Sequence, residues 1–372
     1  MGGMTRSDIR PTDQAGPGSS PDSAAGADHT SGENGRVWTA GSAGVQRATP
    51  AEIEAALRRD DQARAWFFLP RQETDELGHA ARRLGIDALA IEDLLDEREA
   101  MKLDWVGSSM VAVMKAVTFD AAAGELESVP VSVLAGPRAM IVLAGESMRS
   151  ELCHALDKAE KEISADGIPA AIHAVLDVIM DGYSAVLDLM EDEVDTLSEL
   201  LFDDKPLQRD QQLHAFRLRR SLAGLRRSTH PMRDIASGLA NAAGRAAATQ
   251  NTGESPATDS AEKLLGTKSV REFSDIADHA DHAAQAADSL REVISSMYET
   301  NLALSDVHLN TVMKKLTGWA AIIAVPTLIT GFMGMNVPYP GFQTRTGFLV
   351  AFAVMIVVVT TLFVTLKKKD WI

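Results

Sequence analysis

The sequence contains a single cysteine, Cys153, among its 372 residues. One thiol cannot form an internal disulfide, and no Cys/His cluster exists for a structural zinc ion. Basic residues are also scarce, because 36 Lys and Arg stand against 52 Asp and Glu and give a formal net charge of −16. A protein that coats nucleic acid needs a basic footprint to displace counterions, so we expect no nucleic-acid partner.

Two common signals are missing as well. The first residues show no basic stretch followed by an apolar core, so no signal peptide is predicted. No Gly-rich phosphate loop of the Walker type is visible, so ATP is not expected to be a driving force, and no organic cofactor is predicted. Residues 1–45 are rich in Gly, Ser, Ala, Asp and Thr and nearly free of large apolar groups. They are predicted to form a disordered extension.

The most informative feature is a pair of uncharged segments near the C-terminal end. No charged residue occurs from Leu316 to Thr344, and none from Thr346 to Leu366. A helix needs about 20 apolar residues to cross a bilayer. We therefore predict two transmembrane helices, 316–336 and 347–366, joined by an outer loop at 337–346. The alternative, a hairpin buried in a soluble core, is disfavoured because two such runs rarely occur together there.

Lysines flank both predicted spans. Lys314 and Lys315 precede the first span, and a basic tail at 367–372 follows the second. Cytoplasmic flanks carry an excess of Lys and Arg. This pattern predicts a multi-pass protein of the cell (inner) membrane, with both termini in the cytoplasm and the linking loop outside.

Upstream of the spans, residues 46–166 are predicted to form a cytoplasmic α/β domain. Short β-type runs alternate there with helical ones. Strands are expected at 66–69, 110–114, 129–134 and 140–143, and helices at 74–84 and 89–95.

Residues 167–261 are predicted to hold two paired long helices and a loose segment. The helices are expected at 170–202 and 207–240, with the loose segment at 241–262. The first helix is acidic and the second is basic. We favour antiparallel pairing of their opposite charges over a basic helix that binds nucleic acid.

A third helical segment starts near residue 262 and has no helix breaker before Pro326. If unbroken, it is roughly 100 Å long at 1.5 Å per residue. We therefore predict a stalk helix, 262–315, that continues into the first span. A helix of this kind makes sense as a stalk packed against copies of itself.

Steps of three and four residues place a row of small and polar residues on one face of this helix. Two interpretations stay open: the row allows tight helix contact in lipid, or it lines a water-filled path. Mg²⁺ gives up its water reluctantly and prefers oxygen ligands, so such a path suits it. One chain supplies one lining helix, so a path requires an oligomer. The row comprises Glu292, Glu299, Asp306, Asn310, Met313, Thr317, Ala320, Ala324, Thr327, Gly331 and Gly334.

The tripeptide Gly334-Met335-Asn336 directly follows the first span. With the upstream runs 310–317 and 326–331, a second span and the basic end, it resembles the CorA family of magnesium transporters. The resemblance implies an α+β membrane protein and not an enzyme. It implies a homopentameric funnel with an N-terminal α/β cytoplasmic domain, a long stalk helix continuous with the first transmembrane helix, and two C-terminal transmembrane helices.

The resemblance also implies roles for individual residues. Gly334, Met335 and Asn336 would form an outer selectivity ring for hydrated Mg²⁺. Met313 and Leu316 would form a hydrophobic constriction that gates by dewetting. The pore-lining set implied by the resemblance and by the row is Asn310, Met313, Leu316, Thr317, Ala320, Ala324, Thr327 and Gly331. Glu292, Glu299 and Asp306 would be an acidic stalk face on the cytoplasmic side.

A regulatory Mg²⁺ site is implied in the stalk. The run from Ser274 to His279 is similar to the family's Asp-x-x-Asp-His segment, which points to Asp275 and Asp278. Asp120 of a neighbouring subunit would be their partner, and loss of the ion would loosen the subunits and open the pore. A solvated helix face and a transition-metal His/Asp site are the alternatives.

Two departures from the family pattern bear on the transported ion. Met333 stands where many members have an aromatic residue, and the loop from Val337 to Arg345 has no carboxylate and one arginine. Cobalt or nickel could therefore also pass, whereas Met335 argues mildly against the zinc-transporting branch. Three functions compete: a Mg²⁺ channel, a Zn²⁺, Co²⁺ or Ni²⁺ transporter on the same fold, and a membrane-tethered sensor without transport.

Overall fold

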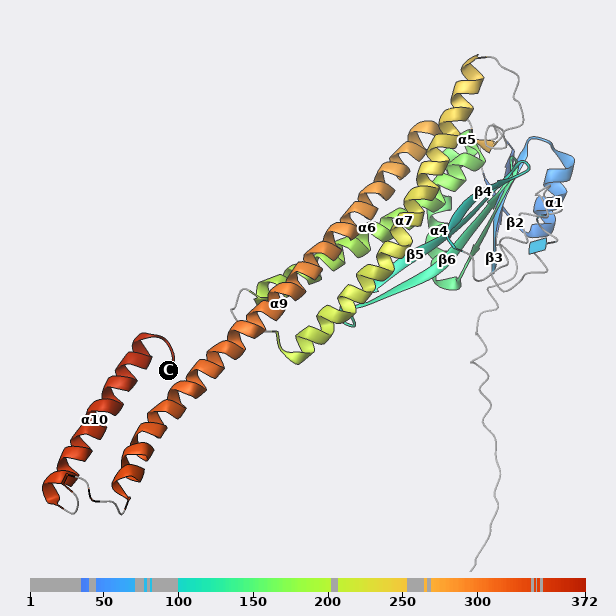
Figure 1. Ribbon diagram of the computed structural model, residues 1–372. Coiled ribbons are helices and arrows are strands. Elements are labelled where there is room, and N and C mark those ends of the chain that lie inside the picture. The colour runs from blue at the N-terminus through green and yellow to red at the C-terminus, as the bar shows by residue number, and fades with distance from the viewer. Residues whose placement is uncertain are drawn as a thin grey trace, which may run out of the picture.

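The computed structural model describes residues 35–39, 45–70, 77, 78, 81, 100–201, 207–252, 264, 265, 269–335, 338, 340, 341 and 344–372. Figure 1 shows two parts, a body that holds the sheet and most helices, and an arm that projects from it. The arm consists of α10 (Arg345–Lys368) and the second half of α9 (Val270–Met333). The first half of α9 belongs to the body.

Within the described ranges, seven strands form one mixed sheet in the order β2-β1-β3-β7-β6-β5-β4. The β3–β7 pairing is parallel and the other pairings are antiparallel. The strands predicted at 66–69, 110–114, 129–134 and 140–143 are confirmed. The bounds are β1 (Gly35–Thr39), β2 (Gln46–Ala48), β3 (Ala63–Pro70), β4 (Lys102–Val106), β5 (Ser109–Asp120), β6 (Glu125–Ala135) and β7 (Ala139–Ala144).

Helices cover both faces of this sheet. Alternate residues of β5 point to opposite sides: Val111 and Val113 join a core with α1 (Pro50–Arg59), and Met110 and Met114 join a larger core on the other face. That larger core includes α4 (Glu146–Lys158), α5 (Glu160–Asp166) and α6 (Ile168–Leu201). Period-two alternation along a strand explains this division. The predicted α/β domain is thus observed.

The two short helices predicted in this domain are only partly visible. Of the helix predicted at 74–84, Leu77 and Ala81 are described and are buried in the core beside α1. The helix predicted at 89–95 lies outside the described residues.

The strand β1 lies within the segment predicted to be disordered, so that prediction was wrong for Gly35–Thr39. Trp38 is buried, with 3% of its surface exposed. Arg36 Nη2 donates to both carboxylate oxygens of Asp157, at 2.8 and 2.9 Å. A buried aromatic residue and an ion pair to α4 stabilise this strand. The Gly/Ser-rich residues around it made the strand hard to recognise in the sequence. Residues 1–34 and 40–44 of the predicted extension lie outside the described residues.

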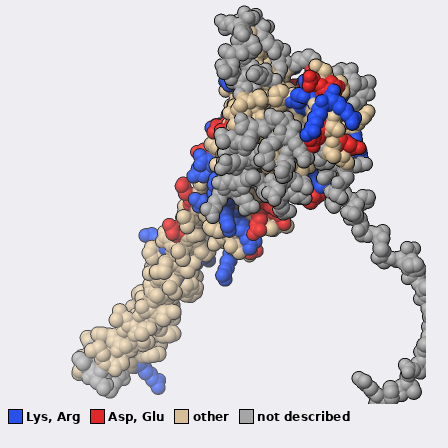
Figure 2. Space-filling model, turned by 90° about the vertical axis from the view of Figure 1, so that its right-hand side faces the viewer, with Lys and Arg blue, Asp and Glu red and all other residues tan. Residues whose placement is uncertain are grey.

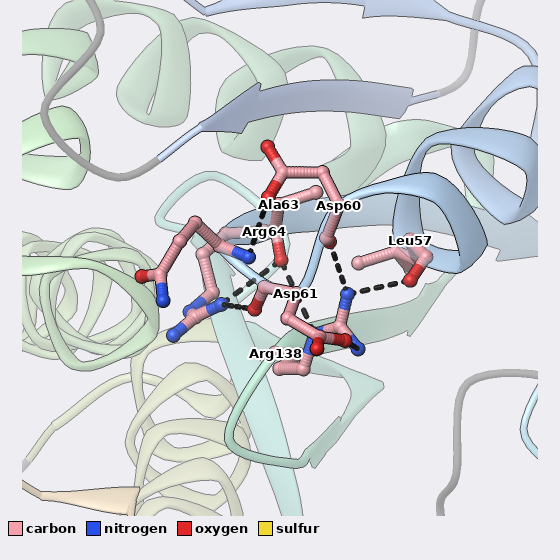
Figure 3. Close-up of polar contacts among 7 residues, drawn as sticks. Leu57, Asp60, Asp61, Ala63, Arg64 and Arg138 are labelled. Atoms are coloured by element: carbon pink, nitrogen blue, oxygen red, sulfur yellow. Dashed lines mark hydrogen bonds and ion pairs between the residues drawn. The ribbon is translucent and has the colours of Figure 1, made fainter.

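Arg138, in the turn between β6 and β7, ties the loop after α1 to the sheet (Figure 3). Its Nη2 donates to the carbonyl oxygens of Leu57 and Asp60, both at 2.6 Å. Arg64 reaches the same loop and donates to the carbonyl oxygen of Asp61 at 3.1 Å. Leu57 lies in the last turn of α1, where carbonyl groups have no partner within the helix, and Arg138 supplies a donor for it.

The two long helices of the body are α6 and α7 (Arg209–Thr252). They confirm helices at 170–202 and 207–240, except that α7 begins at Arg209 and that 202–206 lie outside the described residues. The prediction of a loose segment at 241–262 was wrong for 241–252, which continue α7. Alanines explain the difference, because Ala242, Ala243 and Ala246 have high helix propensity and are buried.

The predicted pairing of the acidic α6 with the basic α7 is realised at one position. Among the described residues, a single ion pair joins the two helices, His214 Nε2 to Glu193 Oε2 at 2.7 Å. The helix α7 packs chiefly against α9. Its Arg226 Nε donates to Asp288 Oδ1 of α9 at 2.6 Å. The charged residues of α7 are therefore paired in part with the stalk helix α9, and with α6 through the one His214–Glu193 contact.

The helix α9 is one continuous element of 64 residues, about 96 Å at 1.5 Å per residue. This confirms a stalk helix that continues into the first predicted span. Its first half is packed against α6 and α7, with Phe273, Ile276 and Ile294 fully buried. Asn301 is the last residue of this buried stretch, and its Oδ1 accepts the backbone N–H of Leu207 at 3.1 Å.

Candidate functional site

Three helices in the described ranges are long and apolar enough to cross a membrane: α6, α9 and α10. The apolar window of α6 is 61% buried within the body, so the protein core accounts for it. The corresponding windows are 6% buried in α9 and 0% buried in α10. Figure 2 shows the arm almost free of charged side chains. The uncovered apolar surface of the arm fits a lipid environment.

The helix α10 packs against one face of α9. The covered or partly covered residues of the α9 arm recur at steps of three and four, which marks that face. These residues are Gly318, Ala321, Ile322, Val325, Pro326, Ile329 and Met333.

The row of small and polar residues lies on the other side of α9. At 100° per residue, its membrane portion is roughly opposite the face that α10 covers. All of its members are exposed in the single chain. Packing against α10 therefore does not explain why these residues are small. The members within this portion are Thr317, Ala320, Ala324, Thr327 and Gly331.

Four members of this part of the row, Ala320, Ala324, Thr327 and Gly331, line an open groove of about 950 Å³ along α9. Small residues provide its floor, and large apolar side chains such as Ile323, Leu328 and Phe332 stand beside it. The Thr327 hydroxyl donates to the carbonyl oxygen of Ile323 at 2.9 Å. Because its hydrogen is directed to its own helix, the lone pairs of this oxygen are available as acceptors toward the groove.

Further along the helix toward the body, the remaining predicted pore and stalk residues are exposed as well. They lie on α9, as the groove does, and no other part of the described chain covers them. They are Asn310, Met313, Leu316, Glu292, Glu299 and Asp306.

The predicted selectivity tripeptide begins where α9 ends. Gly334 N donates to Thr330 O at 2.9 Å, and Met335 N donates to Phe332 O at 3.2 Å. Both residues are exposed. Asn336 lies outside the described residues.

The predicted regulatory aspartates are not gathered within one chain. Asp275 and Asp278 are exposed on α9, while Asp120 ends β5. Asp120 Oδ1 accepts the backbone N–H of Ala123 at 3.0 Å, so within the chain it stabilises the β5–β6 turn. A shallow depression on α9 holds Asp278, Asp281 and His282. Across the described ranges, no group of three His, Cys, Asp or Glu side chains is placed to hold a metal ion.

A family model for a "CorA-like Mg2+ transporter protein" matches residues 61–368. The chain belongs to the CorA family. The predicted resemblance is thereby confirmed, and with it the expectation that the protein is not an enzyme, since CorA proteins are ion transporters.

Individual CorA proteins are similar over most of this chain. The cobalt/magnesium transport protein CorA of Thermotoga maritima is 26% identical over 331 residues, 86% of this chain and 87% of that protein. The protein of the same name from Methanocaldococcus jannaschii is 24% identical over 320 residues, 84% of this chain and 93% of that protein.

Solved structures share the whole fold. The complete structure of the M. jannaschii CorA magnesium transporter has a TM-score of 0.68 at 20% identity and covers 91% of this chain and 99% of that one. The full-length CmaX protein gives 0.68 at 21% identity, with 92% and 99% covered. The CorA fold therefore includes the α/β body, the long helices and the two apolar C-terminal helices of this chain. As a CorA protein, the chain is a membrane protein, with α9 and α10 as its candidate spans.

One contact in this CorA arm was not predicted from the sequence. After α10, Asp370 adopts a left-handed conformation with φ 56°, and the chain turns back toward α9. A Cβ atom on Gly318 would lie 3.0 Å from Ile372 Cγ1 and 3.2 Å from the carbonyl oxygen of Trp371. Glycine at 318 therefore leaves room for this close approach. The one available signal was the glycine itself, next to Trp319 in an uncharged run.

Proposed function

We propose that this chain transports divalent cations, chiefly Mg²⁺, across the cell membrane through a pore lined by α9. The observation that carries the proposal is the exposed row of small and polar residues on the face of α9 turned away from α10. A helix that packs against its own hairpin partner on one side and leaves a polar stripe on the other suits a position around a central path.

One chain supplies only one wall of such a path, so the pore is formed by several copies. The resemblance to CorA implies a homopentamer. Large apolar residues on either side of the groove, such as Ile323 and Leu328, support this arrangement because they can pack against neighbouring copies while the small residues face the axis. In this arrangement the small residues of the row line the path, and the large residues on either side of it form the helix–helix contacts.

The chemistry of the row fits a hydrated ion. Mg²⁺ loses its water reluctantly, and its bound waters present hydrogens outward. A pore for this species needs acceptors, and Thr327 offers hydroxyl lone pairs because its hydrogen is donated to Ile323 O. Thr317 and Asn310 supply further hydroxyl and amide oxygens. At the outer mouth, Gly334, Met335 and Asn336 form the proposed selectivity ring, and Met313 and Leu316 form the proposed constriction.

Charge favours cation entry into the cell. With the lysine-flanked ends of the hairpin inside, both termini are cytoplasmic. An inside-negative potential contributes about 2.3 kcal/mol per charge per 100 mV, and a divalent ion gains about twice that. Glu292, Glu299 and Asp306 on the cytoplasmic stalk raise the local concentration of cations.

Feedback by cytoplasmic Mg²⁺ is the proposed regulation. Because one chain gathers no metal-binding group among its described residues, the site would lie between subunits, with Asp275 and Asp278 from one and Asp120 from the next. Bound Mg²⁺ neutralises carboxylates that otherwise repel, and its loss would loosen the ring.

Flux measurement on Asn336→Ala tests the transport proposal. Purified protein in vesicles should take up Mg²⁺, and uptake should fall by at least about tenfold when the ring loses its amide oxygens. Asn241→Ala, a change at an exposed residue of α7, should leave uptake unchanged. Equal uptake by the Asn336 variant and the native protein would refute the ring, and no uptake by the native protein would favour a sensor without transport.

Ion competition separates the transport candidates. The names of the relatives include cobalt as well as magnesium, so Co²⁺ should compete with Mg²⁺ for uptake. A strong preference for Zn²⁺, or dependence on a pH gradient, would instead favour a Zn²⁺ transporter. For regulation, Asp275→Ala should keep conducting at millimolar cytoplasmic Mg²⁺, and unaltered inhibition would rule out the proposed sensor site.

A further inference from the structure

A basic cleft of about 390 Å³ opens in the body, between α7 and the β5–β6 hairpin. Three arginines of α7 (Arg217, Arg220 and Arg227) and Lys115 of β5 line it. Ser128 adds a hydroxyl group. None of these residues belongs to the arm or to the proposed metal sites.

The three arginines of the cleft differ from their neighbours on the same helix. Arg226 is paired with Asp288, and the guanidinium of Arg219 lies over the Tyr298 ring at 5.3 Å. By contrast, Arg217, Arg220, Arg227 and Lys115 have no ion pair with any residue that the structure describes. Spacings of three and seven residues place the three arginines on one face of α7.

The charge of the cleft is strongly unbalanced. Four cationic side chains line it against one carboxylate, that of Glu125, so the formal charge of the lining is four minus one, or +3. Holding like charges together in one concavity raises the free energy of the empty cleft. An anion that enters relieves this repulsion.

The walls of the cleft are fixed by hydrogen bonds between elements. Ser221 Oγ of α7 donates to Gly124 O of the hairpin at 2.9 Å and accepts from Leu126 N at 3.1 Å. Tyr183 of α6 donates its hydroxyl hydrogen to Lys115 O at 2.9 Å. Burial raises the pKa of Tyr183, so it stays a neutral donor. A preorganised cleft loses little freedom when a ligand binds.

We propose that this cleft binds a phosphate-rich anion, such as the di- or triphosphate chain of a nucleotide or an inorganic polyphosphate. Guanidinium groups match phosphate oxygens in pairs, and three of them within one cleft favour a ligand with more than one phosphoryl group. The volume lies within the range of small-ligand sites. The proposal does not depend on transport through α9.

Calorimetric titration of the full-length protein in detergent, without Mg²⁺, tests the cleft. Tripolyphosphate and ATP serve as the two probes. Both should bind; equal affinities would assign recognition to the phosphate chain alone, and tighter binding of ATP would add contacts with the nucleoside. The double variant Arg220→Gln/Arg227→Gln should bind either probe at least about tenfold more weakly, because charge-assisted hydrogen bonds are lost.

Arg209→Gln is the matched control, since Arg209 is exposed on the same helix but lies outside the cleft. Its affinity for both probes should equal that of the native protein. Absence of binding to the native protein, or full binding by the double variant, would overturn the proposal. It would also be overturned if neither probe binds and the double variant instead weakens the oligomer, because a neighbouring chain's carboxylates would then fill the cleft.

Discussion

The two halves of α9 have the same backbone but opposite surroundings. In the first half, Phe273 is fully buried against α6 and α7, with a ring-to-ring distance of 6.4 Å to His173. In the second half, Phe332 is 57% exposed, although it lies in the same helix. Asn301 marks the change from one regime to the other.

This difference shows where each half finds its partners. The first half completes its packing within the chain, so its apolar residues stabilise the body. Most apolar residues of the second half are exposed, and those on one side are covered by α10 and the residues that follow it. Their partners are lipid and, under the proposed function, other copies of the chain.

The comparison is most sharply tested by truncating one phenylalanine in each half. Phe273→Ala should lower the stability of the body by about 3–5 kcal/mol, because it opens a cavity in a packed core. Phe332→Ala should change it by less than about 1 kcal/mol, since little packing within the chain is lost. Thermal unfolding of both variants in detergent gives the two values. Similar losses at both positions would show that the halves do not differ as described.

A second test fills the groove of the second half. Gly331→Leu adds bulk to the face turned away from α10 and should reduce Mg²⁺ flux by about tenfold or more under the proposed function, by narrowing and drying the path. Ile329→Leu, on the face toward α10, conserves volume and should leave flux nearly unchanged. Unimpaired flux in the Gly331→Leu variant would mean that this face does not line the path.

The boundary between the halves can be weakened directly. Asn301→Ala removes the acceptor of the Leu207 N–H and should cost about 1–3 kcal/mol of stability, because a buried donor is left without a partner. Asn310→Ala, at an exposed position of the same helix, should leave unfolding unchanged. Equal melting temperatures for the Asn301 variant and the native protein would show that this hydrogen bond does not stabilise the boundary between the two halves.

The smallest expected effect concerns charge in the first half. Hydrogen bonds from His230 and Arg226 hold the pKa of Asp288 below its usual range, although burial opposes this. A lowered pKa stabilises the folded state above the unfolded-state pKa, and this contribution is lost as pH falls through the folded-state pKa. Asp288→Asn should therefore lower stability by less than about 1 kcal/mol at pH 7, and by progressively less as the pH falls from about 4 toward about 2.

Unfolding of this variant at both pH values, with Asp188→Asn as an exposed control on α6, measures that effect. The control should behave like the native protein at both. A deficit of the Asp288 variant that grows in acid would contradict the assigned sign.

Much of the fold was predictable because it depends on local patterns. Long uncharged runs identified both C-terminal helices, and the lack of a breaker before Pro326 identified the continuity of α9. The strand β1 was missed because its five residues are stabilised by Asp157, which is 121 residues away in the chain. The charge pairing of α6 with α7 was overestimated, because a charge pattern does not reveal that Asp288 of α9 pairs with Arg226 of α7.

The part of the candidate site that a single chain supplies was predictable in a similar way. Helical spacing alone placed the small and polar residues on one face of α9. Which face α10 covers depends on how two separate helices pack, so it emerged only from the structure. The regulatory aspartates Asp120 and Asp275 stay a prediction, because their proposed meeting requires a second chain.

The unbroken course of α9 has a mechanical consequence. From Asn301 to Met333 the helix advances by 333 minus 301, or 32, residues, about 48 Å at 1.5 Å per residue. A stiff rod of that length acts as a lever whose fulcrum is the last contact with the body. A tilt of about 5° at the fulcrum displaces the far end by about 4 Å, more than the width of a water molecule. A small change in the orientation of the body therefore produces a large displacement at the far end of the arm.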